Sequence, residues 1–304
     1  MKAPRIAVVG SSNTDLVITC PRLPQPGETL LGGDLHRYAG GKGANQAVAA
    51  ARAGARVSFI GGHGADDFGR AAKAGLRAEG IDVRHFRASD KLPSGVALIL
   101  LGKKDRQNQI VVADSANAIT PADIDRAAPV LKKAGVIVAQ LETPIPSVRR
   151  AAEIACEAGV PFVLNPAPAF PLPAALYRLV DTLTPNETEA AILTGLTDPE
   201  QAALALRKKG CRRVVITLGS RGALLCDDEG FSHVPVPKVK PRDTVGAGDC
   251  LNAWLAVGIA KSLPIREALR HAVHAASLKV TRLGAQPGMP PRADVEAFLR
   301  RKPR

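Results

Sequence analysis

The alternation of short apolar runs with alanine-rich helical segments constrains the fold of this chain more than any other feature. Six runs rich in Val, Ile and Leu are typical of buried inner strands: Arg5–Val9, Val57–Ile60, Val136–Ala139, Phe162–Leu164, Thr182–Thr184 and Val214–Thr217. Five helical segments lie between them, each followed by a glycine suited to a left-handed helix end: Ala44–Ala53, Asp67–Ala78, Ala122–Lys133, Ser147–Ala158 and Glu200–Lys209. This alternation predicts an α/β fold, with βαβ units around a largely parallel sheet.

Two stretches, residues 15–31 and 94–112, instead alternate apolar and polar residues around a turn. The turn signals are Pro24-Gln25-Pro26-Gly27 and Gly102-Lys103-Lys104-Asp105, which predict two hairpins in a small antiparallel sheet suited to act as a lid. After Pro241 the chain is predicted to be helical over three segments: Ala247–Lys261, Ile265–Thr281 and Arg292–Arg300. Since single α/β units reach about 250 residues, we interpret residues 1–304 as one domain with this lid.

Charge and cysteine content narrow the range of partners and compartments. The 41 Lys and Arg exceed the 28 Asp and Glu by 13, but they are scattered along the chain, which favours a solvated basic surface over a nucleic-acid or lipid surface. The ten aromatic residues are too few for base-stacking platforms. Five isolated cysteines indicate reduced thiols, and no apolar run reaches the length of a membrane span. We expect a cytoplasmic protein without a nucleic-acid or membrane partner.

The segment Asp243-Thr244-Val245-Gly246-Ala247-Gly248-Asp249 stands at the start of a predicted helix, after a strand-like region that ends near Val239. Small residues at a helix start leave backbone N–H groups free to face an anion, and the helix dipole adds to the attraction. Asp249 beside that anion suits a carboxylate that accepts a hydroxyl proton while the N–H groups hold a phosphoryl group. An aspartate that simply favours a helix N-terminus is the alternative.

A second glycine-rich segment, Gly40-Gly41-Lys42-Gly43-Ala44-Asn45-Gln46, also opens a helix. It lacks the spacing of a Walker A phosphate loop, which is absent from the whole chain. Its lysine and amide donors suit a polyol or sugar, although an ordinary strand-to-helix connection has the same composition.

Two further motifs follow predicted strands, and each is weak in isolation. In Asn186-Glu187-Thr188-Glu189, the first and last residues share one helix face and suit Mg²⁺-bound waters above ATP phosphates. Thr217-Leu218-Gly219-Ser220-Arg221-Gly222 is a glycine-rich turn suited to a nucleotide. The pair His271 and His274 has no third ligand nearby in sequence, so we do not predict a metal site there.

The order of these four motifs resembles that of the ribokinase family, the phosphofructokinase-B-type carbohydrate kinases, over nearly the whole chain. Within the family the chain is most similar to the branch that phosphorylates ribose, on four segments: Gly10-Ser11-Ser12-Asn13-Thr14-Asp15, Gly41 to Gln46, Gln140-Leu141-Glu142 and Gly284-Ala285-Gln286-Pro287. The resemblance implies a ribokinase-like three-layer sandwich, with a central mostly parallel sheet and a small antiparallel β lid.

The resemblance also implies ATP-dependent phosphorylation of D-ribose at its O5 hydroxyl, with Asp249 as catalytic base beside Gly246, Ala247 and Gly248. The implied ribose-binding residues, apart from Asp249 itself, are Asn13, Asp15, Gly41, Lys42, Gly43, Asn45 and Glu142. The implied ATP-binding residues are Asn186, Thr217, Leu218, Gly219, Ser220, Arg221, Gly222 and Gly248. A kinase for another sugar or a nucleoside, and a non-catalytic sugar-sensing or nucleic-acid-binding protein of this fold, remain as alternatives.

The resemblance also implies two metal ions and a homodimer. Mg²⁺ would bridge the ATP phosphates largely through water, with Glu189 nearby, and the lid would form a homodimer contact. A monovalent cation, usually potassium, would be held mostly by backbone carbonyls of five residues: Asp243, Val245, Lys279, Arg282 and Gly284. The chain departs from the family at Gly288, where serine is common and a hydroxyl ligand is missing, and at Ser115, where glycine is common.

Overall fold

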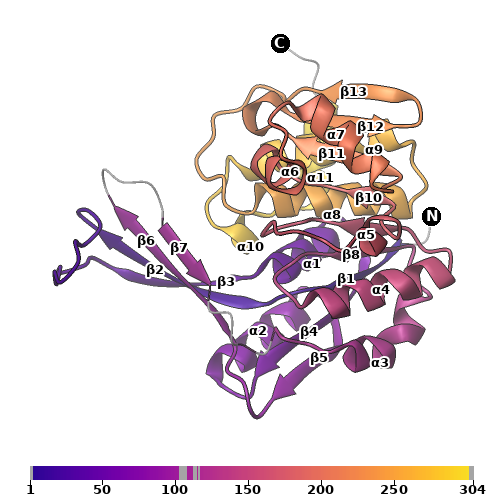
Figure 1. Cartoon of the computed structure of the whole chain (residues 1–304). Coiled ribbons are helices and arrows are strands. Elements are labelled where there is room, and N and C mark those ends of the chain that lie inside the picture. The colour runs from indigo at the N-terminus through magenta and orange to yellow at the C-terminus, as the bar shows by residue number, and fades with distance from the viewer. Residues whose placement is uncertain (1–2, 103–107, 112–114, 116, 301–304) are drawn as a thin grey trace.

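A computed structural model of the chain contains two β-sheets and describes residues 3–102, 108–111, 115 and 117–300 (Figure 1). The larger sheet has nine strands in the order β13-β12-β11-β10-β9-β8-β1-β4-β5. Its strands are β1 (Arg5–Val9), β4 (Arg56–Gly64), β5 (Asp82–Ser89), β8 (Val136–Ala139), β9 (Phe162–Leu164), β10 (Thr182–Leu183), β11 (Arg213–Thr217), β12 (Ala223–Asp227) and β13 (Gly230–Val234).

The pairs from β11 through to β5 are parallel, whereas the pairs β11–β12 and β12–β13 at one edge are antiparallel, so β12 alone runs against the other strands of this sheet. All six predicted inner strands are present, which confirms the mostly parallel central sheet. The strand-like region predicted to end near Val239 ends earlier, because β13 stops at Val234 and residues 235–242 form no regular element.

Helices cover both faces of this sheet and make three layers. They are α1 (Lys42–Arg52), α2 (Asp67–Ala78), α3 (Pro121–Leu131), α4 (Ile145–Glu157), α5 (Ala174–Tyr177), α6 (Glu187–Thr194), α7 (Pro199–Lys208), α8 (Ala247–Ala260), α9 (Ile265–Lys279), α10 (Ala285–Gly288) and α11 (Arg292–Leu299). A short 3₁₀ turn, η1, spans Gly219–Arg221.

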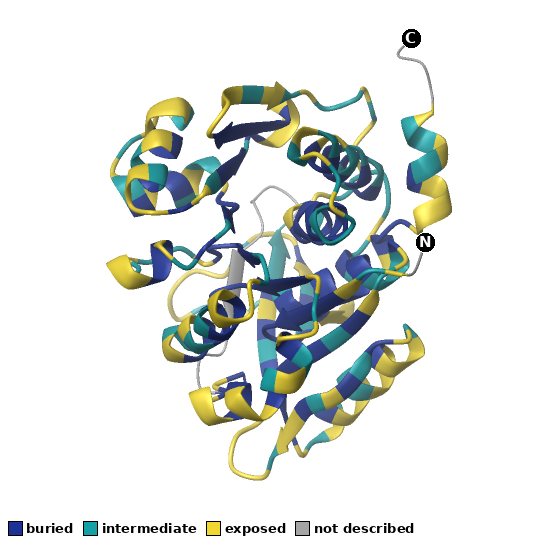
Figure 2. Ribbon diagram, turned by 90° about the vertical axis from the view of Figure 1, so that its right-hand side faces the viewer, coloured by how far each residue is buried: buried dark blue, intermediate teal, exposed yellow. Residues whose placement is uncertain are grey.

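Alternate residues of the inner strands point into two separate apolar cores. In β1, Ile6 and Val8 belong to the core with α1, α8 and α9, while Ala7 and Val9 belong to the core with α3 and α4. Figure 2 shows the buried residues along the sheet and on the inward sides of the helices. Burial on both faces explains why these strands are continuous apolar runs in the sequence.

The predicted glycine helix ends are confirmed at four of five positions. Gly54, Gly80, Gly159 and Gly210 have positive φ angles of 90°, 73°, 66° and 122°. The prediction is wrong for Gly135, which is absent from the positive-φ glycines of the described chain and instead donates its N–H to Arg5 O at 2.8 Å. Gly135 therefore leads directly into β8 and does not cap a helix.

The smaller sheet has the order β3-β2-β6-β7 and projects from the three-layer body (Figure 1). It contains β2 (Asn13–Cys20), β3 (Leu35–Gly40), β6 (Gly95–Gly102) and β7 (Asn108–Val111). Each predicted hairpin is antiparallel internally, and a parallel pairing of β2 with β6 joins the two.

The first hairpin is longer than the predicted 15–31, because its returning strand is β3. Pro21, Pro24 and Pro26 cannot donate to a ladder, so pairing resumes only near Gly33, whose N–H donates to Thr19 O at 2.7 Å, and β3 itself begins at Leu35. The predicted turn residues Lys103, Lys104 and Asp105 lie outside the described residues.

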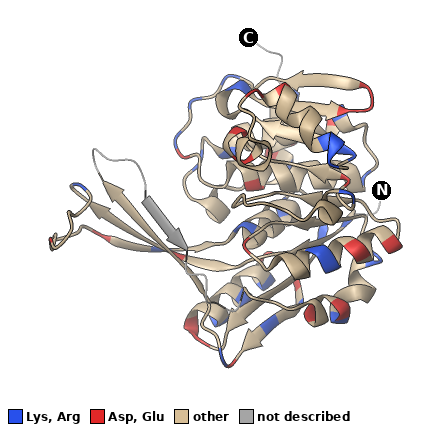
Figure 3. Cartoon of the chain, in the orientation of Figure 1, with Lys and Arg blue, Asp and Glu red and all other residues tan. Residues whose placement is uncertain are grey.

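Basic and acidic residues are interspersed over the helices (Figure 3). Many form local pairs, such as Arg150 with Asp125 at 2.7 Å and Arg149 with Glu153 at 2.8 Å. Over residues 3–102 and 117–300, no helix is both long and apolar enough to cross a membrane.

Candidate active site

The predicted functional segments meet at one edge of the large sheet, where its parallel strands end. The segments that follow β1, β8, β9, β10 and β11 begin at Gly10, Gln140, Asn165, Thr184 and Leu218. Because the carboxyl ends of parallel strands share an edge, these five segments lie together there, as ligand sites do in other α/β sheets.

Asp249 is buried in the first turn of α8 and is held by two amide groups from α1. Asn45 Nδ2 donates to Asp249 Oδ2 at 2.9 Å, and Gln46 Nε2 donates to Asp249 Oδ1 at 3.0 Å. Burial raises the pKa of Asp249, while Lys42 and the two amide donors act in the opposite direction. Both carboxylate oxygens are thereby fixed in position next to the start of α8.

A buried amide network supports Asp249 from behind. Gln140 Nε2 donates to Gln46 Oε1 at 2.6 Å, and Gln46 Nε2 also donates to Asn165 Oδ1 at 3.2 Å. Asn165 Nδ2 in turn donates to Thr184 O at 3.1 Å. This chain orients Gln46, which holds the carboxylate.

Glu142, Lys42 and Asp15 form a charged group next to Asp249. Glu142 Oε2 accepts hydrogen bonds from Ser11 Oγ and, at 3.0 Å, from the backbone N–H of Lys42. Burial, with Glu142 and Asp249 adding repulsion, raises the pKa of Asp15 to about 7. Although burial lowers the pKa of Lys42, the nearby carboxylates outweigh it and leave that pKa above its ordinary value. A single ammonium therefore stands among four carboxylates, those of Asp15, Glu142, Glu189 and Asp249.

Asn13 lies at the start of β2, beside the same group. Its Oδ1 accepts from Asn117 Nδ2 at 2.7 Å, and Asn117 Oδ1 accepts from Ser12 N at 3.0 Å. A Cβ at Gly95 would lie 2.1 Å from Asn13 Oδ1, so glycine is required there. The side chain of Asn13 is thus fixed in orientation before any ligand arrives.

Two glycines let the start of α1 touch the backbone after β1. A Cβ at Gly41 would lie 2.6 Å from Asn13 N, and one at Gly43 would lie 2.6 Å from Ser11 N. Gly41 also has a φ of 88°, which L side chains rarely adopt. This close approach brings Lys42 and Asn45 to the end of β1.

The predicted nucleotide residues lie together on the adjacent strands. Asn186 forms a β-bridge with Thr217, so the Asn186 motif and the turn 217–222 are neighbours. Asn186 and Glu189 form a capping box at the start of α6, with Glu189 N donating to Asn186 Oδ1 at 2.7 Å. Arg221 of η1 pairs with Glu187. Gly222 has a φ of 102°, and a Cβ there would lie 2.0 Å from Val234 O.

The amino-terminal end of α8 has free space beside it. Gly246 is the N-cap, with a φ of 77°, and no side chain of the described chain caps this helix end. A Cβ at Gly248 would meet nothing within 4 Å. Backbone N–H groups at such an end attract an anion. Asp249, one residue further on, stands beside it.

The sequence comparison decides which family this constellation represents. Residues 3–292 match the pfkB family of carbohydrate kinases. The chain belongs to this family. It is 41% identical over 296 residues to a ribokinase of Bacillus subtilis, covering 97% of this chain and 99% of the relative. It is 39% identical over 300 residues to a ribokinase of Haemophilus influenzae, covering 97% and 98%.

The fold agrees with that of solved members of the family. A structure of ribokinase from Arabidopsis thaliana in complex with ribose and ATP superimposes with a TM-score of 0.92 at 32% identity, covering 99% of this chain and all of that one. The chain is therefore a carbohydrate kinase with the ribokinase fold.

The residues predicted for a monovalent cation surround a lysine side chain in this pfkB kinase. Asp243 Oδ1 accepts from Val245 N at 2.9 Å, and Asp243 Oδ2 accepts from Gly284 N at 2.7 Å. The buried Lys279 Nζ donates to Asp243 O at 3.0 Å. Burial lowers the pKa of Lys279, and Asp243 opposes that shift. Arg282 points elsewhere and pairs with Asp294 at 2.6 Å.

No group of three or more His, Cys, Asp or Glu suited to a metal ion occurs among the residues that the structure describes. His271 faces Glu267 at 3.8 Å, and His274 Nδ1 lies 2.8 Å from Arg270 O. These partners lie on the same helix, α9.

Sequence reasoning missed three residues of the site, Asn165, Thr184 and Asn252. Asn252 Nδ2 donates to Gly248 O at 2.9 Å, and its Oδ1 accepts from Thr184 Oγ1. The available signal was a polar residue directly after a strand or one turn into an apolar helix.

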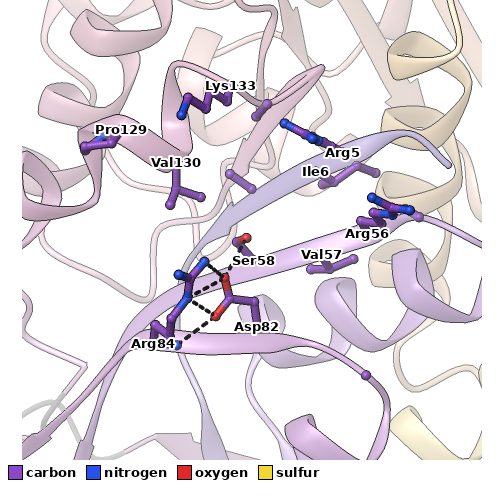
Figure 4. Close-up of a pocket in the computed structure, with 14 residues that line it drawn as sticks. Arg5, Ile6, Arg56, Val57, Ser58, Asp82, Arg84, Pro129, Val130 and Lys133 are labelled. Atoms are coloured by element: carbon purple, nitrogen blue, oxygen red, sulfur yellow. Dashed lines mark hydrogen bonds and ion pairs between the residues drawn. The ribbon is translucent and has the colours of Figure 1, made fainter. Parts of the chain in front are cut away.

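A cavity of about 670 Å³ lies at the opposite, amino-terminal edge of the sheet (Figure 4). Arg5, Arg56, Arg84 and Lys133 contribute to its lining, and Arg84 pairs with Asp82 at 2.8 Å. None of the predicted site residues lines this cavity.

Proposed function

We propose that this kinase transfers the terminal phosphoryl group of ATP to the O5 hydroxyl of D-ribose, giving ribose 5-phosphate and ADP. The observation that carries the proposal is the buried Asp249, fixed by Asn45 and Gln46 at the open start of α8. The names of the two relatives, and the ribose and ATP held by the Arabidopsis enzyme, support this choice of substrates.

Ribose would be bound by groups that match its alternating hydroxyls. The acceptors are Asp15, Glu142 and Asn13, and the donors are Lys42 and the backbone of Gly41 and Gly43. Asn45 Oδ1 is buried without a hydrogen-bond partner among the described residues, which suits a ligand hydroxyl.

Asp249 would accept the proton of O5 as that oxygen attacks the phosphorus. A raised pKa brings the carboxylate closer to the value at which a general base works best near neutral pH. The N–H groups of Gly246 and Gly248 would hold the oxygens of the transferring phosphoryl group, whose negative charge the helix dipole favours. The N–H of Ala247, between them, donates to Thr244 O at 3.1 Å and keeps this turn in shape. Proton acceptance and phosphoryl binding would thus occur one residue apart.

ATP would lie over Asn186, the turn 217–222 (Thr217, Leu218, Gly219, Ser220, Arg221, Gly222) and Gly248. Mg²⁺ fits this site only if the phosphates and water supply most of its ligands, because no group of three ligating side chains occurs among the described residues. Glu189 would orient those waters, and the ion would neutralise phosphate charge. At the segment predicted to hold a monovalent cation, the Lys279 ammonium donates to the backbone carbonyl of Asp243 at 3.0 Å.

The smaller sheet would act as the lid and as a homodimer contact in the cytoplasm. Leu35 and Leu98 are exposed on the same face of its strands, which suits contact with another apolar surface. Closing the lid would exclude water, so that the sugar receives the phosphoryl group. The five cysteines are free, in keeping with a reducing compartment.

The test is ADP release by the purified protein with Mg·ATP and, in turn, D-ribose, fructose, 2-deoxyribose and adenosine. We expect the highest kcat/KM with D-ribose and phosphate at O5 of the product. A higher value with another sugar or with adenosine would overturn the ribose assignment, and no turnover with any of them would overturn the proposed activity.

A further inference from the structure

Lys279, at the end of α9, is fully buried, with 0% of its side chain exposed. Lysine is almost never fully buried unless its charge is compensated. The compensating groups here belong to Asp243, in the segment 243–248 that leads into the first turn of α8. Lys279 Nζ lies 3.0 Å from Asp243 O and 4.0 Å from Asp243 Oδ2.

The same aspartate ties together two loops. Its carboxylate accepts the N–H of Val245 on one side and of Gly284 on the other, while its backbone carbonyl accepts the lysine. Asp243 N also donates to Val280 O at 3.1 Å, one residue after Lys279. The ammonium therefore lies at the junction that positions the backbone leading to Gly246 and Asp249.

Gly288 makes room for the lysine. A Cβ built at residue 288 would lie 3.1 Å from Lys279 Cε, 3.1 Å from Leu283 O and 3.4 Å from Arg282 O. The end of the lysine side chain and the backbone carbonyls of residues 282 and 283 thus border the same small space beside Gly288. Asp243 and Arg282 are two of the predicted cation ligands, and the lysine ammonium already takes the carbonyl of Asp243, so the predicted potassium site does not fit this chain.

We propose that the Lys279 ammonium is a built-in replacement for the monovalent cation and holds the 243–248 loop in its active conformation without potassium. An alkylammonium carries the same single charge as an alkali ion and donates hydrogen bonds to carbonyl oxygens. Because it is covalently attached, its occupancy does not depend on the salt concentration. Lys279 is thereby a positioning residue that acts through Asp243 on the start of α8. The inference rests on the proposed function for the role of that loop.

The first experiment compares salts on the wild-type kinase. Turnover is measured with Mg·ATP and the preferred sugar in about 100 mM tetramethylammonium chloride, and again with potassium chloride at the same ionic strength. We expect the two rates to agree within about twofold, because no external cation completes the loop. Stimulation by potassium of roughly tenfold or more would overturn the proposal.

The second experiment removes the ammonium. Lys279→Ala is expected to lose roughly tenfold or more of its turnover in tetramethylammonium chloride, because the loop loses its central charge. Potassium or ammonium ions then restore much of the rate by entering the vacated space. Lys279→Met, which fills the space without a charge, is expected to lose activity and not to respond to potassium.

Thermal unfolding without substrates separates this inference from the proposed function, since it requires no sugar and no catalysis. Potassium is expected to raise the unfolding midpoint of Lys279→Ala by about 2–4 °C and to leave the wild type unchanged. The matched control is Lys73→Ala, because Lys73 Nζ also donates to a backbone carbonyl, Phe86 O at 3.1 Å, far from the loop. A Lys279→Ala protein no more sensitive to potassium than Lys73→Ala, in both rate and midpoint, would overturn the proposal. If Lys279→Ala does not fold, the wild-type comparison of salts decides.

Discussion

The predicted sugar side and the predicted nucleotide side of the site are built in different ways. On the predicted sugar side, Asn45 reaches Asp249 across 204 positions of sequence, and Asn13 reaches Asn117 across 104. On the predicted nucleotide side, the contacts span less of the sequence: Asn186 and Glu189 of the capping box lie 3 positions apart, and the exposed pair Arg221 and Glu187 lies 34 apart. Long-range buried contacts fix the sugar side before ligands bind, whereas the nucleotide side uses ordinary helix-start geometry.

This difference predicts how each side responds to substitution. When one member of a buried hydrogen-bond network is removed, its partners lose their hydrogen bonds, so the free-energy cost is large. Removing an exposed helix cap costs only the stability that this one cap contributes. Substitutions on the sugar side should therefore have larger effects than substitutions on the nucleotide side.

The largest effect is expected from Asp249→Asn. The amide keeps the shape of the side chain but cannot accept the O5 proton, so kcat should fall by about 10²–10⁴-fold. Binding of ATP and ribose, measured by calorimetry, should change little. The matched control is Asp227→Asn, a buried aspartate on β12, which should keep its turnover. A near-normal kcat for Asp249→Asn would remove Asp249 from its role as base.

Asp15→Asn should weaken ribose binding and stabilise the free protein at high pH. In the folded protein the pKa of Asp15 is about 7, above its ordinary value of 3.8, so the native state binds more protons between these values and loses stability as pH rises. Asparagine does not ionise. The variant should therefore gain stability relative to the wild type from pH 4 to pH 8, by up to about 4 kcal/mol.

Urea unfolding at pH 5 and pH 8 without sugar measures this gain, and the KM for ribose, expected to rise by roughly 10-fold or more, measures the loss of binding. A stability difference between the two proteins that stays constant with pH would contradict the burial of an ionisable Asp15.

The smallest effect is expected from Asn186→Ala. Loss of the cap of α6 should cost about 1 kcal/mol of stability and raise the KM for ATP a few-fold, while the KM for ribose stays unchanged. Asp198→Ala is the matched control, because Asp198 caps the neighbouring α7 by accepting from Gln201 N at 2.9 Å. If both variants have the same KM for ATP, Asn186 serves only as a cap.

Periodicity along the chain was enough to predict the inner strands and the helices that follow them. Periodicity could not distinguish a glycine that ends a helix in a left-handed conformation from a glycine that leads into a strand. Gly135 is of the second kind. The motifs located the elements of the site, because the Gly40, Asn186 and Thr217 motifs each lie at or just after the end of a strand and the Asp243 motif leads into α8.

The sequence could not predict contacts that depend on topology. Asn165 holds Gln46 only because β9 and β1 are neighbours of β8 in the sheet. The same holds for Lys279. Its position near the cation ligands followed from the motif, but the direction of its side chain depends on the packing of α9 against α8.

The contact between residues 279 and 288 has a consequence for how these two positions change in evolution. Any residue larger than glycine at 288 would crowd the end of the lysine side chain, at a Cβ distance of 3.1 Å from Lys279 Cε. A side chain at 288 and the lysine at 279 therefore compete for the same space, and we expect residues 279 and 288 to change together among related kinases.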